Sequence, residues 1–449
     1  MISKHLPRGA KKFQVFMAAF ALLTVSLACS FSIPFSAFQI SGNPTPQSPL
    51  GRIAYVGKDG NIYTTDRNGK QLSAITQDAA LNPSAGQVGR MYQYLTWAPD
   101  GQHLAFVRIS VGQSSQEVSL VSSLSDGKKP VNNFTSQDVQ PFYLYWSPNS
   151  QSIAFLGSEA TTGALGQYLV AASGGKSKLI GGGQPYYWDW SPDNRTMIVH
   201  TGGASSDNPD ARLSFVGVQG SSPARDLAVK PGYFDAPAWS PAGDGVALVT
   251  QNAAGDGELI LAGQDGKEKK VLASLSGPAT FAWSPKGIHL AYTVYDPNGT
   301  SPTIRLVVLD STKPDLHHQV TQGDVVVFFW SPDGQKIAYF VRGSPGPSAS
   351  AIQMVAQTKA SVDLVVWVYD RLSGTSKQVA AFSPTDSFQQ IFPYYSQYLR
   401  SDTIWSPDSQ DLVLSGVDSA GGNAIYTVGA DGSHFQKIAD GDLAFWSWK

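Results

Sequence analysis

Short apolar runs recur along the chain, and a polar turn precedes each of them. A typical run is residues 337–341 (IAYFV), which follows the turn Ser-Pro-Asp-Gly at residues 331–334. In such a turn proline presets φ, aspartate bonds its own backbone, and glycine accepts a positive φ. The runs are short and rich in β-branched and aromatic residues, which favours β-strands. The pattern therefore predicts many short strands that tight turns connect.

A tryptophan stands directly before nearly every one of these turns, and the whole motif repeats. Successive tryptophans are 49, 44, 49, 44, 47, 75 and 41 residues apart. A period of 40 to 50 residues indicates a solenoid, a propeller or an array. Each unit has room for four short antiparallel strands, and four-stranded sheets repeated radially form a β-propeller. We expect the repeated tryptophans to pack between neighbouring blades: Trp97, Trp146, Trp190, Trp239, Trp283, Trp330, Trp405 and Trp446.

The two ends of the repeat region complement each other. Residues 51–76 resemble the second, third and fourth strands of a unit whose first strand is missing. The chain stops at residues 444–449 (AFWSWK), a first strand with nothing after it. Joining the two ends completes a blade and leaves no open sheet edge. The sequence therefore predicts an all-β propeller of eight four-stranded blades, the last closed by both chain ends, with seven blades as the alternative.

The repeat also carries a family resemblance. The string WSPDG, followed by IAY or IAF and later by IY, resembles the repeats of TolB-like β-propellers, which also occur in prolyl oligopeptidases and dipeptidyl peptidases. The resemblance covers residues 51–449 and implies the fold, while one fold can carry many functions. TolB itself carries an additional α/β domain before its propeller, which the family uses for partner contact. Only a short linker precedes the propeller here, so the resemblance does not extend to a Tol-system role.

The N-terminal residues have the pattern of an export signal. Four basic residues precede an uncharged apolar run that starts at Phe13, as in the first two regions of a signal peptide. Cys29 is the only cysteine, and Ser26 and Ala28 supply the small residues before it in an imperfect lipobox. We predict a signal peptide over residues 1–28 and lipidation of Cys29. An uncleaved membrane helix over residues 13–33 and plain secretion remain as alternatives.

The expected domain plan follows from this signal. Residues 29–50 are a tether rich in proline and serine, and residues 51–449 form the propeller. Because positive charges stay on the cytoplasmic side, the propeller is expected outside the cell, anchored to the outer face of a bacterial cytoplasmic membrane. A monomer is expected. One cysteine allows no intrachain disulfide.

Composition and motifs argue against several function classes. Net charge is −2, and basic residues cluster only at the N-terminus, so no nucleic-acid partner is predicted. The match to a nucleophile elbow at Ser419 has Val417 in place of its first glycine, and residues 173–177 are interpreted as a hairpin turn rather than a phosphate loop. His103 and His289 occupy equivalent repeat positions, and residues 317–318 (HH) are placed in a loop. No metal, cofactor or catalytic residue is predicted.

The turn aspartates are also given a structural role, because a Ser-Pro-Asp-Gly turn requires its own carboxylate. They are Asp100, Asp193, Asp333 and Asp408. Two functional hypotheses remain. The first is a non-catalytic binding or scaffold propeller for an envelope protein, peptide or glycan. The alternative is a propeller hydrolase or lyase that acts on extracellular glycans or peptides through scattered channel-facing residues.

A candidate recognition surface comes from the Trp330 unit, whose spacing of 75 residues exceeds that of every other unit. The excess falls in residues 343–361 and 383–401, two connections on the face opposite the Ser-Pro-Asp-Gly turns. Long loops on a rigid scaffold often carry function. The candidate binding residues are Phe388, Phe392, Tyr394, Tyr395, Tyr398 and Arg400, together with Tyr94, Tyr143 and Tyr187, which each precede a repeat tryptophan by three positions. Packing of these side chains into the core is the other interpretation.

Overall fold

The structure is a computed structural model that describes residues 51–218, 224–297, 303–320, 323–343 and 364–449. The chain divides into two compact units, Met1–Pro46 and Gln47–Lys449, and everything described below belongs to the second. The predicted signal peptide, Cys29 and the tether lie outside the described residues. So does nearly all of the first insertion, residues 343–361.

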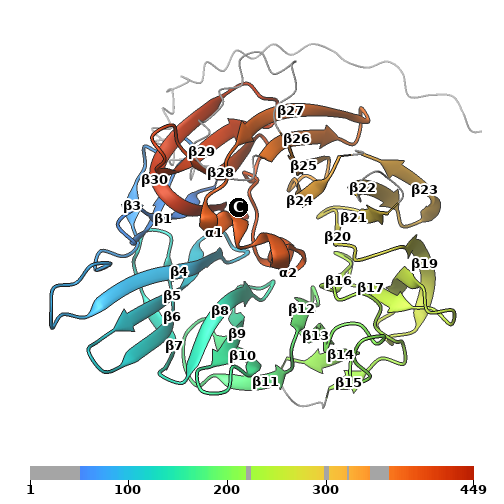
Figure 1. Cartoon of the computed structure of the whole chain (residues 1–449), viewed down its shortest axis with the longest axis horizontal. Coiled ribbons are helices and arrows are strands. Elements are labelled where there is room, and N and C mark those ends of the chain that lie inside the picture. The colour runs from blue at the N-terminus through green and yellow to red at the C-terminus, as the bar shows by residue number, and fades with distance from the viewer. Residues whose placement is uncertain (1–50, 219–223, 298–302, 321–322, 344–363) are drawn as a thin grey trace, which may run out of the picture. The chain divides into compact units, whose positions relative to one another are not determined.

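The described strands form seven antiparallel sheets arranged in a ring (Figure 1). Six of these sheets have four strands each, and the first strand of each lies nearest the centre. They are β4 (Gly89–Trp97), β5 (His103–Val111), β6 (Gln116–Leu124) and β7 (Val131–Ser136); β8 (Val139–Trp146), β9 (Ser152–Glu159), β10 (Leu165–Ala171) and β11 (Lys178–Gly182); β12 (Tyr186–Trp190), β13 (Thr196–Thr201), β14 (Arg212–Gly217) and β15 (Arg225–Asp226); β16 (Ala238–Trp239), β17 (Val246–Gln251), β18 (Gly257–Ala262) and β19 (Glu268–Leu275); β20 (Phe281–Trp283), β21 (His289–Asp296), β22 (Thr303–Asp310) and β23 (Lys313–Gln319); and β24 (Val325–Trp330), β25 (Lys336–Arg342), β26 (Leu364–Asp370) and β27 (Thr375–Phe382).

The seventh sheet joins the two ends of the ring. Its strand order is β28 (Asp411–Val417), β29 (Asn423–Gly429), β30 (Phe435–Trp446), β1 (Ile53–Gly57), β2 (Ile62–Thr65) and β3 (Ser73–Ala74). The first half of β30 pairs with β29, and its second half pairs with β1, where Trp446 lies opposite Ile53. The propeller is therefore closed by both ends of the repeat region, as the sequence predicts.

The preferred number of eight blades is corrected to the alternative, seven. The last two repeat units share β30, which runs from one unit into the next without a break, so that both belong to a single six-stranded sheet. The Trp405 unit is also irregular, because its first strand is reduced to one bridge between Trp405 and Leu412.

The Ser-Pro-Asp turns form as their sequence requires. The Oδ1 atom of Asp193 accepts hydrogen bonds from the Ser191 hydroxyl at 2.6 Å and the Arg195 backbone N–H at 3.0 Å. Asp100, Asp333 and Asp408 accept backbone N–H groups in the same way. Gly334 at the end of one turn has a φ of +70°, a conformation that glycine adopts without strain. These aspartates hold the turns.

The repeated tryptophans are all buried, with exposed fractions of 0–8%. Four of them also donate the indole N–H to a backbone carbonyl of the preceding unit. The pairs are Trp97 to Phe445 at 3.1 Å, Trp283 to Ala238 at 3.1 Å, Trp330 to Ala282 at 3.0 Å, and Trp405 to Phe329 at 2.9 Å. Each of these side chains therefore both packs and bonds between units.

Two local expectations were wrong. The second insertion is not an open loop: it forms α1 (Asp386–Gln389), the short 3-10 helix η1 (Phe392–Tyr394) and α2 (Tyr395–Ser401). Thr385 caps α1 by accepting a bond from the Phe388 N–H. Residues 317–318 lie in β23 rather than in a loop, and they pair with Leu309 and Val308 of β22.

Among the described residues, no helix has the length and apolar composition to cross a membrane.

Candidate functional site

Helix α2 lies at the centre of the ring (Figure 1), where it caps the inner edges of several sheets. The Gln397 side chain accepts the Trp188 N–H at 2.8 Å and donates to the Trp188 carbonyl at 2.9 Å. The Tyr395 hydroxyl bonds the N–H and the carbonyl of Phe328 at 2.7 and 3.0 Å. Innermost strands have unpaired backbone groups on their free edge. Two side chains of α2 therefore replace a missing neighbouring strand.

Arg400 extends this bonding to two more sheets. Its guanidinium donates to the carbonyls of Ala236 at 3.1 Å and Phe281 at 2.8 Å. On the other side, the Thr96 hydroxyl donates to the Ser401 carbonyl at 3.1 Å. Helix α2 is thus fixed to strands from distant parts of the chain, and we call it the central plug.

Buried carboxyl groups surround the central plug. Burial raises the pKa of Asp189 and Asp235 above the usual range, and the charge of Arg400 partly opposes both shifts. Asp189 is also satisfied by hydrogen bonds from the Trp239 N–H at 2.8 Å and the Tyr145 hydroxyl at 2.9 Å. Burial raises the pKa of Asp402 to about 7, and the hydrogen bond from the Ser401 hydroxyl partly opposes this shift. The Oδ1 atom of Asp402 has no hydrogen-bond partner among the described residues.

The raised pKa of Asp402 predicts stability that falls as pH rises. An unfolded aspartate titrates near 3.9, so between about pH 4 and pH 7 the folded state holds a proton that the unfolded state has lost. The free energy of unfolding therefore decreases across this window, by on the order of 4 kcal/mol for a shift of about three units. Asp402→Asn should flatten this decrease, and chemical denaturation at pH 5 and pH 8 measures it.

The exposed acid Asp386 supplies a matched control, since Asp386→Asn removes a carboxyl group from the same insertion and leaves Asp402 in place. Asp189 and Asp235 are shifted in the same direction, so some pH dependence should persist in Asp402→Asn. A variant with the full wild-type slope would show that Asp402 is not the group that titrates.

A groove of about 1610 Å³ lies between the helical insertion and the ends of the neighbouring sheets. Five of the nine predicted binding residues line it: Tyr94, Tyr143, Tyr187, Tyr394 and Tyr398. The other four do not. Phe388 is 2% exposed and packs against Phe340 and Phe382, beside Phe392. Tyr395 and Arg400 serve the central plug. These four side chains therefore pack in the interior or bind other elements of the chain, as the alternative expectation of core packing has it.

The aromatic side chains at one end of the groove contact one another. Tyr143 and Tyr398 pack edge to face with ring centroids 5.1 Å apart, and Tyr187 stacks on Phe234 at 4.4 Å. The Tyr143 hydroxyl is held by the backbone carbonyl of Gln397 at 3.0 Å. The base of this end is therefore rigid.

Two tyrosines project into the groove and remain exposed. The exposed fraction is 57% for Tyr394 and 38% for Tyr94, and neither hydroxyl has a hydrogen-bond partner among the described residues. Tyr94 has a φ of +54° at a register shift in β4, between Gln93 and Thr96. A positive φ is uncommon for a residue other than glycine, and such strain concentrates at functional sites. Tyr94 lines the groove at this bulge.

The other end of the groove is polar. Asp418, Asp440 and Asp442 line it together with Lys58 and Asn423. Lys58 binds Asp440 at 2.9 Å, and Asn423 donates to Asp442 at 2.8 Å. Hydrogen bonds from Lys437 and Lys58 lower the pKa of Asp440 to about 2. Asp418 also pairs with Lys437, at 2.7 Å, so each of these carboxylates already has an intrachain partner.

Sequence reasoning missed part of this lining. Tyr92, Phe142 and Tyr186 occupy the same inner strands as the predicted tyrosines, and Phe234 precedes β16. The available signal was a second aromatic residue next to or near the predicted tyrosine before Trp97, Trp146 and Trp190. The polar end had no comparable signal, because Asp418 lies in an ordinary hairpin turn and Asp440 lies within β30, at a position that resembles a turn in the sequence.

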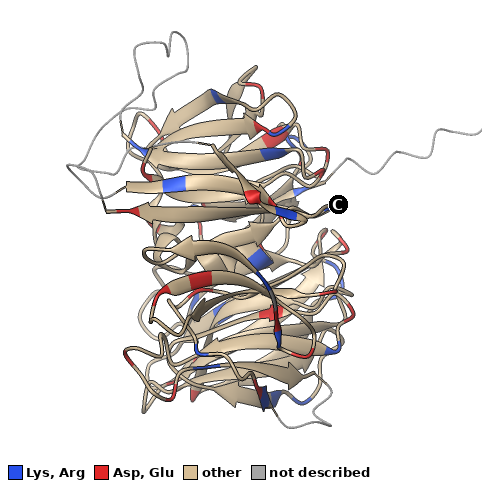
Figure 2. Cartoon of the chain, turned by 90° about the vertical axis from the view of Figure 1, so that its right-hand side faces the viewer, with Lys and Arg blue, Asp and Glu red and all other residues tan. Residues whose placement is uncertain are grey.

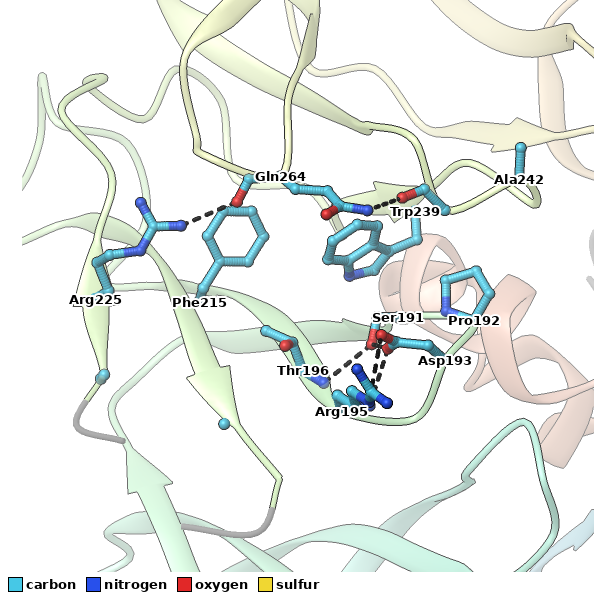
Figure 3. A pocket seen from close by; sticks show the side chains of 13 residues that line it. Ser191, Pro192, Asp193, Arg195, Thr196, Phe215, Arg225, Trp239, Ala242 and Gln264 are labelled. Carbon is cyan, nitrogen blue, oxygen red and sulfur yellow. Dashed lines mark hydrogen bonds and ion pairs between the residues drawn. The ribbon is translucent and has the colours of Figure 1, made fainter. Parts of the chain in front are cut away.

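A second cavity, of about 910 Å³, opens on the face that carries the Ser-Pro-Asp turns (Figure 3). Phe215 and Trp239 form its wall, and the Arg225 guanidinium lies 5.0 Å from the Phe215 ring centroid. Arg225 also donates to the backbone carbonyls of Gln264 at 3.0 Å and Asp265 at 2.8 Å. This cation is used to join two sheets, and the cavity is interpreted as a gap at their junction.

Charges of one sign do not gather along the side of the propeller. In the side view of Figure 2, acidic and basic residues are interspersed along the ribbons rather than gathered by sign. In the part of the chain that the structure describes, no group of three or more His, Cys, Asp or Glu side chains is placed to hold a metal ion. The tyrosines are therefore the groups in the groove that indicate a function.

Comparisons with known proteins agree with the fold. No family model and no curated protein matches the chain. Similar solved structures include an oligogalacturonate lyase in complex with manganese (14% identity, 85% of this chain and 96% of that chain, TM-score 0.50) and an oligogalacturonate lyase from Vibrio parahaemolyticus (13%, 85% and 97%, 0.50). TolB from Acinetobacter baumannii is also similar (13%, 83% and 87%, 0.38). At these identities the likeness extends to the fold alone, and the chain is an all-β propeller.

Proposed function

We propose that the chain is a non-catalytic binding propeller and that the groove is its recognition surface. The main support for this proposal is that tyrosines from distant parts of the chain lie around the same groove. Tyrosines from the three strands β4, β8 and β12 meet two tyrosines of the insertion around one cavity, although more than 200 residues separate Tyr187 from Tyr394. Exposed tyrosines with free hydroxyls over a rigid base offer both apolar contact and hydrogen bonding at low entropic cost.

Binding is favoured over catalysis by the state of the groove's carboxylates. General acid–base work needs a group whose pKa lies near the working pH and which can reach the substrate. Asp440 is held ionised by two lysines, and Asp442 is held by Asn423 and Ser387. Asp402, whose pKa is raised, does not line the groove. The hydrolase or lyase alternative would require a reactive group other than these.

Export and membrane attachment remain part of the proposal. They rest on the signal pattern of residues 1–28, on Cys29 and on the tether, all outside the described residues. Within the propeller, the Cα of Gly51 lies against Pro407 of a Ser-Pro-Asp turn. Gly51, where the described part of the propeller begins, therefore lies on the turn face, opposite the groove. The proposed role is that of an exported, tethered propeller that binds an envelope protein, peptide or glycan.

Photo-crosslinking tests the position of the recognition surface. A photoreactive amino acid in place of Tyr394 in the full-length chain should form an adduct with a bound ligand in the producing cells. The matched control is the same amino acid in place of Leu372, which is 70% exposed in the β26–β27 turn on the opposite face. Adding Tyr94→Ala should lower the adduct at position 394 about tenfold, the equivalent of ~1.4 kcal/mol for one aromatic contact. Equal labelling from both positions would contradict the proposal.

A further inference from the structure

We propose that the ligand of the groove is an uncharged glycan, an inference that rests on the proposed function and specifies its ligand. The size of the groove favours an extended ligand. A pocket for a single small molecule usually has a volume of about 300–1000 Å³. The groove, at about 1610 Å³, is larger, and it continues from the stacked pair Tyr187 and Phe234 to the polar end at Asp418. Its form suits a chain of linked units.

The charges that line the groove favour an uncharged ligand. Among the described residues that line the groove, Lys58 is the only basic one, and its ammonium group already binds Asp440. Three carboxylates share the same lining. A polyanion such as a uronic-acid polymer or a nucleic acid would meet these carboxylates without cations to receive its own charges. A polycation would have to displace Lys58 and Lys437 from Asp440 and Asp418. An uncharged ligand avoids both costs.

The hydrogen-bonding groups of the groove favour a ligand that supplies donors. The polar end presents carboxylate oxygens at Asp418, Asp440 and Asp442, and carboxylates only accept hydrogen bonds. The ligand must therefore bring donors. A proline-rich peptide, which also fits aromatic grooves, has no N–H at its prolines. Sugar hydroxyls both donate and accept, so they suit the carboxylates as well as the amide side chains of Gln184 and Gln390 in the same lining.

The aromatic end supplies the complementary contact. One face of a sugar ring presents C–H groups, which pack against the electron-rich face of an aromatic ring while the hydroxyls point outwards to polar groups. Tyr94 and Tyr394 are exposed to 38% and 57%, and each ends in a hydroxyl without a hydrogen-bond partner among the described residues. Rings that offer an apolar face beside a free hydroxyl match a ligand that alternates C–H faces with hydroxyl edges.

Titration of the full-length protein with defined probes tests this inference. The neutral probes are cellohexaose, mannohexaose and chitohexaose. The competing classes are a galacturonate hexamer, a proline-rich decapeptide and a lysine-rich decapeptide. We expect binding of at least one neutral hexasaccharide, with an affinity that is unchanged between low and high salt because no ion pair forms. Tyr94→Ala with Tyr394→Ala should weaken that binding at least about tenfold at an unchanged melting temperature. Leu372→Ala should bind like the wild type.

The outcomes separate this inference from the function on which it rests. Binding of only the galacturonate or a peptide probe, or of no neutral glycan, overturns the assignment to uncharged glycans. If position 394 still forms its specific photo-adduct, the groove nevertheless remains the recognition surface. Neutral-glycan binding that survives both tyrosine substitutions places the ligand elsewhere and overturns both proposals.

Discussion

Removing residues 441–449 is expected to unfold the propeller. This segment contains the second half of β30, which pairs with β1 and closes the ring. Phe445 and Trp446 are 2% and 1% exposed, and at roughly 150–250 Å² of buried area each they contribute on the order of 7–12 kcal/mol as an upper bound. That figure is comparable to the whole stability of an ordinary domain, about 5–15 kcal/mol. The deletion would also leave β1 as an open edge and promote aggregation.

Thermal melting and size-exclusion chromatography check this expectation. The matched control is deletion of the exposed Lys449 alone, which leaves the pairing of β30 with β1 intact. Addition of a peptide with the sequence of residues 441–449 should restore a folded fraction to the truncated chain. If the truncated protein melts cooperatively near the wild-type temperature, the closure does not depend on the C-terminal segment.

The second large effect concerns the central plug. Gln397→Met keeps the side-chain volume but leaves the buried N–H and carbonyl of Trp188 without partners. An unsatisfied buried polar group costs about 1–3 kcal/mol, so the substitution should lower the free energy of unfolding by roughly 2–6 kcal/mol. Tyr395→Phe should have a similar effect through Phe328. Denaturant titration measures both.

The control for the plug is Gln390→Met in the same insertion. Gln390 is exposed, and a surface change of this kind is usually neutral to within about 0.5 kcal/mol. Tyr394→Ser should likewise leave stability almost unchanged, because Tyr394 is exposed. Equal stability of Gln397→Met and Gln390→Met would show that α2 does not hold the ring.

The sequence predicts the repeat, the buried tryptophans and the closure because each has a local signature that recurs. The predicted number of blades was wrong because of one strand, β30. Asp440 and Gly441 resemble a turn, yet Gly441 is not among the glycines with positive φ, and β30 continues through it. A Cβ at Gly441 would lie 2.8 Å from the Val56 carbonyl oxygen, so glycine is required there for close strand approach. Close approach and turn formation look alike in a sequence.

Part of the candidate site was predictable because it belongs to the repeat. The three tyrosines that precede repeat tryptophans occupy equivalent places in their units, so their common face follows from the repeat. The insertion has no such register. Tyr394 and Tyr395 are adjacent, yet one is 57% exposed in the groove and the other is 4% exposed in the plug. Which side of a short helix faces the core depends on how the helix docks, and composition does not determine that.

The central claim is that ligands are recognised in the groove, on the face opposite the Ser-Pro-Asp turns. The most direct measurement is the ratio of ligand photo-adduct formed from position 394 to that formed from position 372, in otherwise identical full-length chains. The account predicts a strong adduct from position 394, loss of most of it when Tyr94→Ala is added, and background labelling from position 372. A ligand adduct that forms from position 372 and not from position 394 would place recognition on the turn face and contradict the account.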